Sequence, residues 1–400
     1  MEICKISLPQ SVNDIISMLE NAGHRADAVG GAVRDILMGN AAKDYDVATS
    51  AKPREIKKVF HAHRVIETGI QHGTVTVILG NIPYEITTYR IDGEYSDSRR
   101  PDSVRFTKNL EEDLARRDFT VNAMAYSEKH GLTDCFGGID DLKHGIIRAV
   151  GEPERRFRED ALRMLRAIRF AATLGFRIEE KTNAAIFSLK DRLSMVSWER
   201  IRNEWRRLIM GINSLDVLDK YREIILMLIP ELAPLRLPSI EIWETLNEFD
   251  REIALFALNS DAQGFNTAMR RLKSENLRIR FGVKVLSCMN NPPGAEKNEI
   301  VDFILNYDDD IVLTSLRVGA LLGFVDHAAF DMAFDMISDN IPRTLQMLAI
   351  KGCDLLLLGI KGEPVGRFLW DLLHMVARGE CENELSSLMA LAAAMADNYR

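Results

Sequence analysis

The sequence has few cysteines and no pattern in which they would act together. Its 400 residues include five cysteines and eight histidines. The cysteines are odd in number and widely scattered, no two form a C-x-x-C motif, and no two histidines form an H-x-x-x-H pair. Neither a disulfide framework nor a zinc site is expected.

Long apolar runs are also missing. No stretch of about eighteen apolar residues occurs, and the N-terminal MEICKISLPQ has no basic flank followed by an apolar core. We therefore expect a soluble, cytoplasmic protein without membrane contact. Tandem repeats and low-complexity segments are absent too, and the length predicts roughly two to four domains.

Negative charge predominates, with 59 Asp and Glu against 51 Lys and Arg, but one segment departs from this balance. Residues 151–210 hold 14 basic and 9 acidic residues, and twelve of the fourteen are arginine. The planar guanidinium of arginine bonds phosphates and base edges through two parallel N–H groups. The segment therefore favours a nucleotide or nucleic-acid surface over a merely solvated helix face.

Strand and turn signals are concentrated in the first 150 residues, and helical periodicity takes over from Glu154 onward. A mixed α/β part followed by a helical part is expected. The elements predicted at the start are a strand at 26–29, a turn at Gly30-Gly31, a helix at 32–39, a strand at 44–48, a helix with Ser50 as N-cap and Pro53 in its first turn, and a β-hairpin at 73–90.

Two acids, Asp44 and Asp46, stand one residue apart in an otherwise apolar strand. Side chains alternate along a strand, so both are predicted on one face, and Glu85 on the second arm of the hairpin adds a third carboxylate. Mg²⁺ prefers such oxygen ligands and completes its octahedron with water and substrate phosphates. Two ions roughly 3.5–4 Å apart would activate an attacking hydroxyl and stabilise a leaving pyrophosphate. An isolated D-x-D motif is more often a pair of surface acids, so the neighbouring motifs must show whether this one binds a metal.

Immediately upstream, GGAVRD places two glycines between a strand and a helix. Glycine lets the backbone approach a phosphate closely, and Arg34 adds a cation one turn into the helix. No third glycine follows at the spacing of a dinucleotide fingerprint, so a Rossmann fold is not indicated. A phosphate turn and an acidic metal site this close together predict a triphosphate pocket.

Three segments carry extended motifs: GGAVRDILMGNAAKDYDVAT at 30–49, EEDLARRDFTVNAMAY at 111–126 and EDALRMLRAIRFAATLGF at 159–176. In this order and spacing they resemble the signature motifs of class II tRNA nucleotidyltransferases, the CCA-adding enzymes, and of the related bacterial poly(A) polymerases. The similarity covers residues 25–210. It implies a nucleotidyltransferase palm as an α/β head with a small mixed sheet at 1–150, an all-α neck for nucleobase selection at 151–210, and a helical body and tail for tRNA binding at 211–400.

The activity implied by the resemblance is the addition of C, C and A to the 3′ end of tRNA from CTP and ATP, without a nucleic-acid template and with release of pyrophosphate. Mg²⁺ is the implied cofactor. The matching residues are Asp44 and Asp46 as metal-binding acids, Glu85 as the third catalytic carboxylate, Gly31 and Arg34 at the triphosphate, and Arg117, Asp118 and Asn122 at the ribose.

The third motif suggests how bases are chosen. Asp160, Arg163, Arg166 and Arg169 recur every three residues and are expected along one helix, with neighbours on a shared face. An aspartate accepts from the exocyclic amine of cytosine or adenine while an arginine donates to the adjacent ring acceptor. Uracil and guanine present a carbonyl oxygen there instead. Such a pair would admit C and A and reject U and G, although an ordinary surface salt bridge gives the same spacing.

Several alternatives stay open. The segment DGEYSDSRRPD at 92–102 has the composition of a mobile loop, and in this family a loop here is associated with adding the terminal A. An enzyme that adds only the terminal A, a bacterial poly(A) polymerase, and a non-catalytic RNA-binding protein remain rivals; the last would be expected to have lost one acid of the pair. The basic segment at 270–280 fits either the tRNA backbone or an exposed helix face. The protein is expected to be a monomer or a homodimer.

Overall fold

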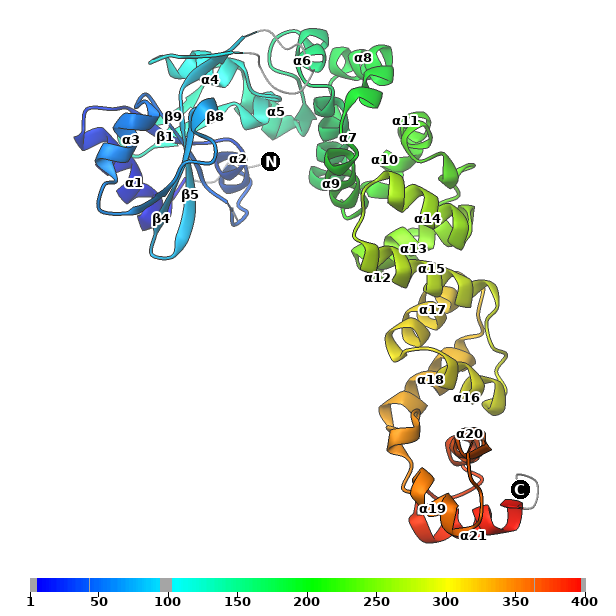
Figure 1. Cartoon of the computed structure of the whole chain (residues 1–400). Coiled ribbons are helices and arrows are strands. Elements are labelled where there is room, and N and C mark those ends of the chain that lie inside the picture. Colours follow the sequence, from blue (N-terminus) through cyan, green and yellow to red (C-terminus); the bar gives the residue numbers. More distant parts are fainter. Residues whose placement is uncertain (1–5, 43, 94–102, 363, 397–400) are drawn as a thin grey trace. The chain divides into compact units, whose positions relative to one another are not determined.

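The structure is a computed structural model that describes residues 6–42, 44–93, 103–362 and 364–396. Most of the loop expected at 92–102 lies outside the described residues. The chain divides into two compact units, Met1–Ile224 and Ile225–Arg400 (Figure 1). The first unit begins with an α/β part and continues in helices, and the second is helical, which confirms the expected fold class. Within the described ranges, no helix is long and apolar enough to cross a membrane.

The α/β part is built on a mixed sheet. Its strands and those beside it are β1 (Ala26–Val29), β2 (Asp46–Thr49), β3 (Arg64–Ile66), β4 (Thr74–Leu79), β5 (Ile82–Thr88), β6 (Arg90–Asp92), β7 (Val104–Phe106), β8 (Met124–Ser127), β9 (Gly131–Asp134), β10 (Ile146–Ile147) and β11 (Arg177–Ile178). Seven of them form one sheet in the order β3-β4-β5-β2-β1-β8-β9. Strands β2 and β5 run parallel, and the other neighbours in this sheet are antiparallel.

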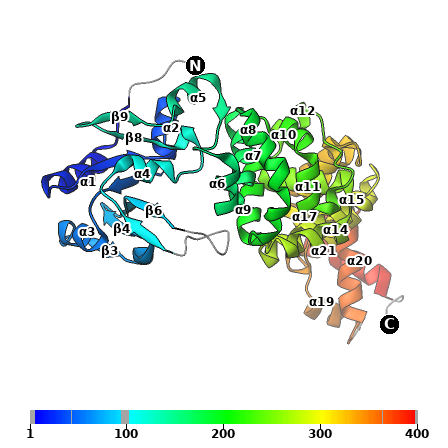
Figure 2. The ribbon, with the colours of Figure 1, turned by 90° about the horizontal axis from the view of Figure 1, so that it is seen from above.

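Helices cover the sheet and continue beyond it. Those of the first unit are α1 (Gln10–Asn21), α2 (Gly31–Leu37), α3 (Pro53–Val59), α4 (Leu110–Ala115), α5 (Gly138–His144), α6 (Pro153–Glu159), α7 (Leu162–Leu174), α8 (Glu180–Leu189), α9 (Trp198–Ile209) and α10 (Ser214–Lys220), and α11 (Arg222–Leu228) crosses the boundary between the units. Helix α1 packs on β1 and β2, α2 on β1 and β8, and α3 on β4 and β5. Helix α7 packs against α9, as Figure 2 also shows.

The parallel pairing of β2 with β5 sets the position of two predicted acids. Asp46 lies opposite Glu85 in the register of these strands. Because side chains alternate along a strand, Asp46 shares a face with Ala48, two residues on. Ala48 packs in a buried cluster with Leu110 and Leu114 of α4. Helix α4 is therefore anchored on the same face of the sheet as Asp46, and the residues that follow α4 lie close to this acid.

Three local expectations differ from the structure. Asp44 precedes β2, which begins at Asp46, so the two acids do not alternate within one strand. The N-cap of α3 is Lys52, whereas the Ser50 hydroxyl accepts the backbone N–H of Arg25. Asp160 has extended backbone angles between α6 and α7, so it lies outside the helix that carries the arginines.

The second unit continues as helices packed on their neighbours in the chain. They are α12 (Ile240–Thr245), α13 (Glu248–Asn259), α14 (Ala262–Arg271), α15 (Asn276–Asn290), α16 (Lys297–Asn306), α17 (Asp309–Leu321), α18 (His327–Ser338), α19 (Gly352–Leu357), α20 (Pro364–Arg378) and α21 (Leu385–Met395). Helix α15 packs on α13, α14 and α17, and α16 packs on α18 and α20. The segment 291–296 separates α15 from α16.

Candidate active site

The predicted phosphate turn leads from β1 into α2. Gly30 has a φ of 75°, a conformation that side chains other than glycine rarely adopt, and it is the N-cap of α2, which begins at Gly31. A Cβ at Gly30 would lie 3.1 Å from Nη1 of Arg117. Arg34, nearly buried, donates from Nη1 to Oδ1 of Asn122 at 2.6 Å. The turn and the second motif are therefore in direct contact.

The three carboxylates lie within electrostatic reach of one another at the β2–β5 pair. Desolvation by the surrounding protein raises the pKa of Asp46, and the charge of Asp44 adds to this, while Arg117 opposes it. Desolvation also raises the pKa of Glu85, and the charges of Asp46 and Asp44 raise it further. The carboxylates thus repel one another as the sequence predicts, and a cation at this edge would relieve the repulsion.

Arg117 lies between the acids and the phosphate turn. Its Nη2 donates to Oδ2 of Asp113 at 3.3 Å, and its Nη1 is the group beside Gly30. Its Nε is buried without a hydrogen-bond partner within the described part of the chain. Buried polar groups in proteins are nearly always hydrogen-bonded, so this donor fits an oxygen of a bound anion.

Asp118 and Asn122 form the next part of the site. Oδ1 of Asp118 accepts from Nδ2 of Asn122 at 3.2 Å and from the backbone N–H of Phe119 at 2.8 Å. Its Oδ2 accepts from Nε of Arg166 on α7 at 2.8 Å. Burial alone would raise the pKa of the Asp118 carboxyl, but Arg166, with Arg163 and Asn122, lowers it to about 2. The aspartate therefore stays ionised and joins the head to α7.

The spacing of Asp160 predicts partners on α7, but its arginine partner lies on α9. Its carboxylate accepts both terminal nitrogens of Arg200 on α9, with Nη1 to Oδ1 at 3.1 Å and Nη2 to Oδ2 at 2.7 Å. The same carboxylate accepts the backbone N–H of Leu162 at 3.1 Å, at the beginning of α7. Asp160 is thus fixed by a bidentate arginine and by the helix start, and not by the surface salt bridge that its spacing from Arg163 would allow.

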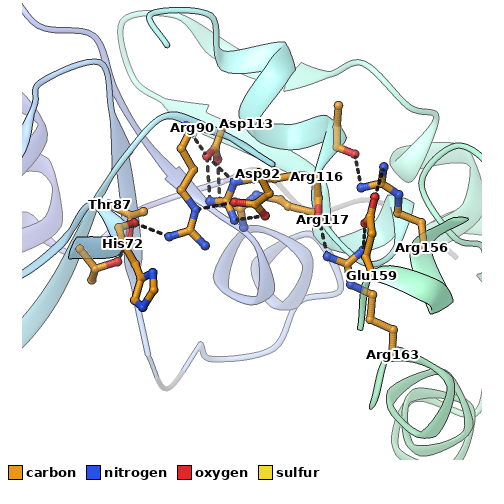
Figure 3. Close-up of polar contacts among 12 residues, drawn as sticks. His72, Thr87, Arg90, Asp92, Asp113, Arg116, Arg117, Arg156, Glu159 and Arg163 are labelled. Carbon is orange, nitrogen blue, oxygen red and sulfur yellow. Dashed lines mark hydrogen bonds and ion pairs between the residues drawn. The ribbon is translucent and has the colours of Figure 1, made fainter. Parts of the chain in front are cut away.

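The arginines of α7 have separate partners. Arg163 donates from Nη1 to Glu159 at 3.0 Å and from Nη2 to the carbonyl of Arg116 at 2.9 Å (Figure 3). Arg169 is 7% exposed and donates from Nε to Glu204 at 2.8 Å. Burial lowers the pKa of Arg169, and Glu204 opposes this. Arg163 thus contacts the α/β part through Arg116, whereas Arg169 is paired with α9.

An aromatic ring joins three of the predicted arginines. Phe170 is nearly buried, and the guanidinium carbons of Arg169, Arg34 and Arg166 lie 3.5, 5.1 and 5.5 Å from its ring centroid. Cations within about 6 Å of a ring centroid are attracted by its π electrons. The ring of Phe170 therefore contacts Arg34, which follows the phosphate turn, and Arg166 and Arg169 of α7.

A cavity of about 240 Å³ opens among these residues. It lies where the segment after α4 faces the start of α7 and α9, and its polar lining comes from Arg116, Arg117, Asp118, Asp160, Arg163, Arg166 and Arg200. A larger cavity of about 1130 Å³, lined mainly by α6 and α8, contains none of the three acids. The smaller cavity brings Arg117 and Asp118, predicted at the ribose, together with Asp160, Arg163 and Arg166, predicted at the base. Asn122, Arg169 and the three acids are not part of its lining.

Sequence reasoning missed four contributors: Asp113, Phe170, Arg200 and Glu204. Three of them carried a readable signal. Glu204 stands on the apolar face of α9 with Ile201, Trp205 and Leu208, and Asp113 stands between Leu110 and Leu114 on the buried face of α4. An acid on the apolar face of an amphipathic helix needs a cationic partner. Arg200 lies one turn before Glu204 and so shares its side of the helix.

The carboxylates at the β2–β5 pair could supply only some of the ligands of a divalent cation. No three His, Cys, Asp or Glu side chains come together closely enough to hold a metal ion anywhere in the described residues. Mg²⁺ sites commonly use one or two carboxylates and take their remaining ligands from water and substrate phosphates. Asp44 and Asp46, with Glu85 beside them, match that sparser type, and the raised pKa values of Asp46 and Glu85 indicate an uncompensated negative site.

Comparison with known proteins identifies the class. A family model described as the Poly A polymerase head domain matches residues 27–148, and one described as the probable RNA and SrmB-binding site of polymerase A matches residues 175–235. Together with the mixed sheet and the helices that follow it, these matches define a nucleotidyltransferase of the poly(A) polymerase head class.

Relatives that match nearly the whole chain show which family within this class it belongs to. The CCA-adding enzyme of Leuconostoc mesenteroides is 45% identical over 96% of this chain and 97% of its own, and that of Lactobacillus delbrueckii is 36% identical over 94% and 95%. A crystal structure of the Bacillus stearothermophilus CCA-adding enzyme in complex with CTP is 29% identical, with a TM-score of 0.78 over 98% of this chain and 99% of that one. The chain belongs to the family of CCA-adding enzymes, the class II tRNA nucleotidyltransferases.

Proposed function

We propose that the protein adds C, C and A to the 3′ end of tRNA, using CTP and ATP without a template and releasing pyrophosphate. One observation carries the proposal: paired side chains run without a break from Arg34 through Asn122 and Asp118 to Arg166. A single bound nucleotide would contact the phosphate turn, the ribose residues and the base-reading residues together. The CTP complex of the Bacillus relative supports the same choice of substrate.

Asp44 and Asp46, assisted by Glu85, would hold Mg²⁺ at the β2–β5 pair. When bound, such ions favour the deprotonated 3′-hydroxyl of tRNA and neutralise the leaving pyrophosphate. The chain's own groups orient the nucleotide, with Gly31 and Arg34 on the triphosphate and Arg117 between the turn and the acids. No protein nucleophile is needed.

Ribose recognition falls to Arg117, Asp118 and Asn122. A 2′-hydroxyl is both donor and acceptor, so a carboxylate and an amide or guanidinium group distinguish it from a deoxyribose carbon. Asp118 is ionised well below neutral pH and can accept at all working pH values, because its pKa is about 2. Asn122, which bonds both Asp118 and Arg34, couples the sugar to the triphosphate side.

Base choice falls to Asp160 with Arg163, and Arg166 supports them through Asp118. Asp160 would accept the exocyclic amine of cytosine or adenine while Arg163 donates to the neighbouring ring acceptor. Arg200 grips both oxygens of Asp160, so it sets the direction in which the free lone pairs point. For Arg169, the contacts with Glu204 and Phe170 favour support of α7 over direct base contact.

We assign nucleotide chemistry to residues 1–150 and 151–210, and tRNA binding to residues 211–400, in the cytoplasm. Within the basic segment at 270–280, Arg271 pairs with Glu231, and Arg278 pairs with Glu248 and Glu252. These two arginines serve the packing of the second unit. The exposed Arg280 is a better candidate for the tRNA backbone.

The test uses tRNA ending before the CCA, after the first C and after the second C, each with CTP alone, ATP alone or both. We expect CTP to add two C residues to the first tRNA, one to the second and none to the third. ATP should add one A only to a CC end, after which addition stops. A poly(A) polymerase would extend every end with ATP repeatedly and ignore CTP. An enzyme that adds only the terminal A would use the CC end and leave the other two unchanged. Either pattern would contradict the proposal.

A further inference from the structure

Asp113 is a fully buried acid that the proposed chemistry does not use. It lies in α4, and its relative exposure is 0%. A buried carboxylate is costly to desolvate unless several donors surround it. Its placement between the apolar Leu110 and Leu114 therefore calls for a specific set of partners.

Four N–H groups from three residues converge on this carboxylate (Figure 3). Oδ1 accepts Nε and Nη2 of Arg116 at 2.9 and 2.8 Å and the backbone N–H of Arg90 at 3.2 Å. Oδ2 accepts Nη2 of Arg117 at 3.3 Å. Burial alone would raise the pKa of Asp113, but Arg116 and Arg117 hold it below its usual range. Asp113 is therefore ionised, and its negative charge attracts the guanidinium groups of Arg116 and Arg117.

Asp113 determines which side of Arg117 faces the nucleotide. With Nη2 bound to Asp113, the guanidinium turns Nη1 toward Gly30 of the phosphate turn. Its charge reaches Asp46, and its Nε has no partner in the described part of the chain. Asp113 thus fixes Nη2 of Arg117, while Nη1 lies beside the phosphate turn.

The same carboxylate also reaches two other elements. Arg90 begins β6, and its guanidinium bonds Asp92 and the carbonyl of His72. Arg116, held by Asp113, offers its carbonyl to Nη2 of Arg163 on α7. Asp113 therefore links β6, the residues after α4 and, through Arg116, helix α7.

We propose that Asp113 is a positioning residue for nucleotide transfer, one that never touches the nucleotide but orients Arg117 toward its sugar and phosphates. The inference rests on the proposed function for the identity of the nucleotide. It predicts that losing the Asp113 charge impairs transfer and ribose discrimination through Arg117, beyond any effect on folding.

The test compares wild type, Asp113→Asn, Arg117→Lys and the double variant, with CTP and dCTP on tRNA lacking its CCA. Asp113→Asn keeps the shape and removes the charge. We expect kcat with CTP to fall by about 100-fold, the size of a misplaced catalytic geometry, and the preference for CTP over dCTP to fall with it. In the Arg117→Lys background the same change should cost less than about threefold, because groups that act through one another are not additive.

The matched control is Asp250→Asn, which removes an acid of the second unit that is 2% exposed and paired with Arg317 at 2.5 Å. Its kcat and its CTP preference should stay at the wild-type values. All variants are assayed well below their own melting temperatures. Should Asp113→Asn not fold, Asp113→Glu, which keeps the charge and displaces it by one methylene, is measured against the same expectations.

The proposal is overturned if Asp113→Asn lowers only the melting temperature, or if its effect in the Arg117→Lys background is as large as in wild type. A failure of the proposed function looks different, because wild type itself would then add no C to tRNA. In that case calorimetric titration of CTP and dCTP into the four proteins decides. Loss of the CTP preference in Asp113→Asn supports the positioning role, and an unchanged preference refutes it.

Discussion

At the scale of single residues, the site consists of arginines whose directions are set by buried acids. Asp113 holds Arg117, Asp118 holds Arg166, and Glu204 holds Arg169. Arginine loses much side-chain entropy when it is fixed, so an arginine that a protein partner already orients binds a nucleotide at lower entropic cost. Pairing inside the protein would thus prepare the candidate site for the proposed nucleotide.

Arg200 provides a prediction about base choice. Arg200→Lys replaces a bidentate grip on Asp160 by a single contact, so the carboxylate loses its fixed direction. We expect incorporation of U or G in place of C to rise by about tenfold, which corresponds to roughly 1.4 kcal/mol of lost discrimination. Sequencing the added nucleotides measures it. Arg207→Lys, an exposed position on α9, is the control, and equal error rates in the two variants would contradict the prediction.

Phe170 gives a second prediction. Phe170→Leu keeps an apolar side chain but removes the ring that Arg34, Arg166 and Arg169 surround. Each cation–π contact contributes about 0.5–2 kcal/mol, so kcat/KM for CTP and for ATP should both fall by about tenfold or more. Phe187→Leu, which removes a ring stacked on Tyr221, should leave both kinetic parameters unchanged. Loss of activity in the control alone would count against the role of Phe170.

At the scale of elements, the turn between β1 and α2 is where the proposed triphosphate would approach the backbone. The positive φ of Gly30 and its proximity to Arg117 disfavour a side chain for two separate reasons. The first reason is backbone strain, and the second is that Nη1 of Arg117 would have to shift by a few tenths of an ångström. These two effects can be separated because Gly23 has a similar φ of 85°, and a Cβ added there would meet no described atom within 4 Å.

Gly30→Ala is therefore expected to lower both stability and activity, whereas Gly23→Ala lowers stability alone. Each change forces a non-glycine residue into a strained region, at about 1–3 kcal/mol. Only Gly30→Ala also displaces Nη1 of Arg117, so its KM for CTP should rise by about tenfold or more on the scale of a lost charged hydrogen bond. Thermal unfolding and initial rates measure the two effects. Equal KM values in the two variants would refute the contact with Arg117.

Elements with strong local signals could be predicted from the sequence, whereas partners from distant segments could not. The strand at 26–29, the turn, the hairpin and the shift to helices follow from periodicity and glycine placement, and the structure confirms them. The start of β2 at Asp46 and the position of Asp160 outside α7 were not predicted, because such boundaries depend on partners from distant segments. Arg200 lies forty residues after Asp160, so no local spacing could indicate their pairing.

At the scale of the whole molecule, the two compact units carry their charges differently. The first unit concentrates arginines and buried acids at the candidate site. In the second unit, buried Asp250 and Glu252 pair with Arg317 and Arg278 between helices. Buried pairs of this kind cost stability when one partner is removed. The second unit therefore uses its internal ion pairs for packing.

Acid stability of the first unit should depend on Asp118. Its folded pKa of about 2 lies below the ordinary value of 3.8, so the ion pair stabilises the fold fully above pH 4 and loses this contribution as the pH falls toward 2. The shift corresponds to about 2 kcal/mol. Asp118→Asn should be less stable than wild type at pH 6, and the gap in urea midpoint should close on approaching pH 2. A gap that stays constant over this range would contradict the shift.

The most direct test of the central claim is nucleotide addition by Asp46→Asn. In the proposed function, Asp46, beside Asp44 and Glu85, supports transfer itself, while tRNA is bound elsewhere in the chain. We predict that wild type extends truncated tRNA by C, C and A, and that Asp46→Asn binds the same tRNA with unchanged Kd but transfers at least about 1,000-fold more slowly, as for loss of a group central to charge stabilisation. Transfer at the wild-type rate by Asp46→Asn would contradict the account.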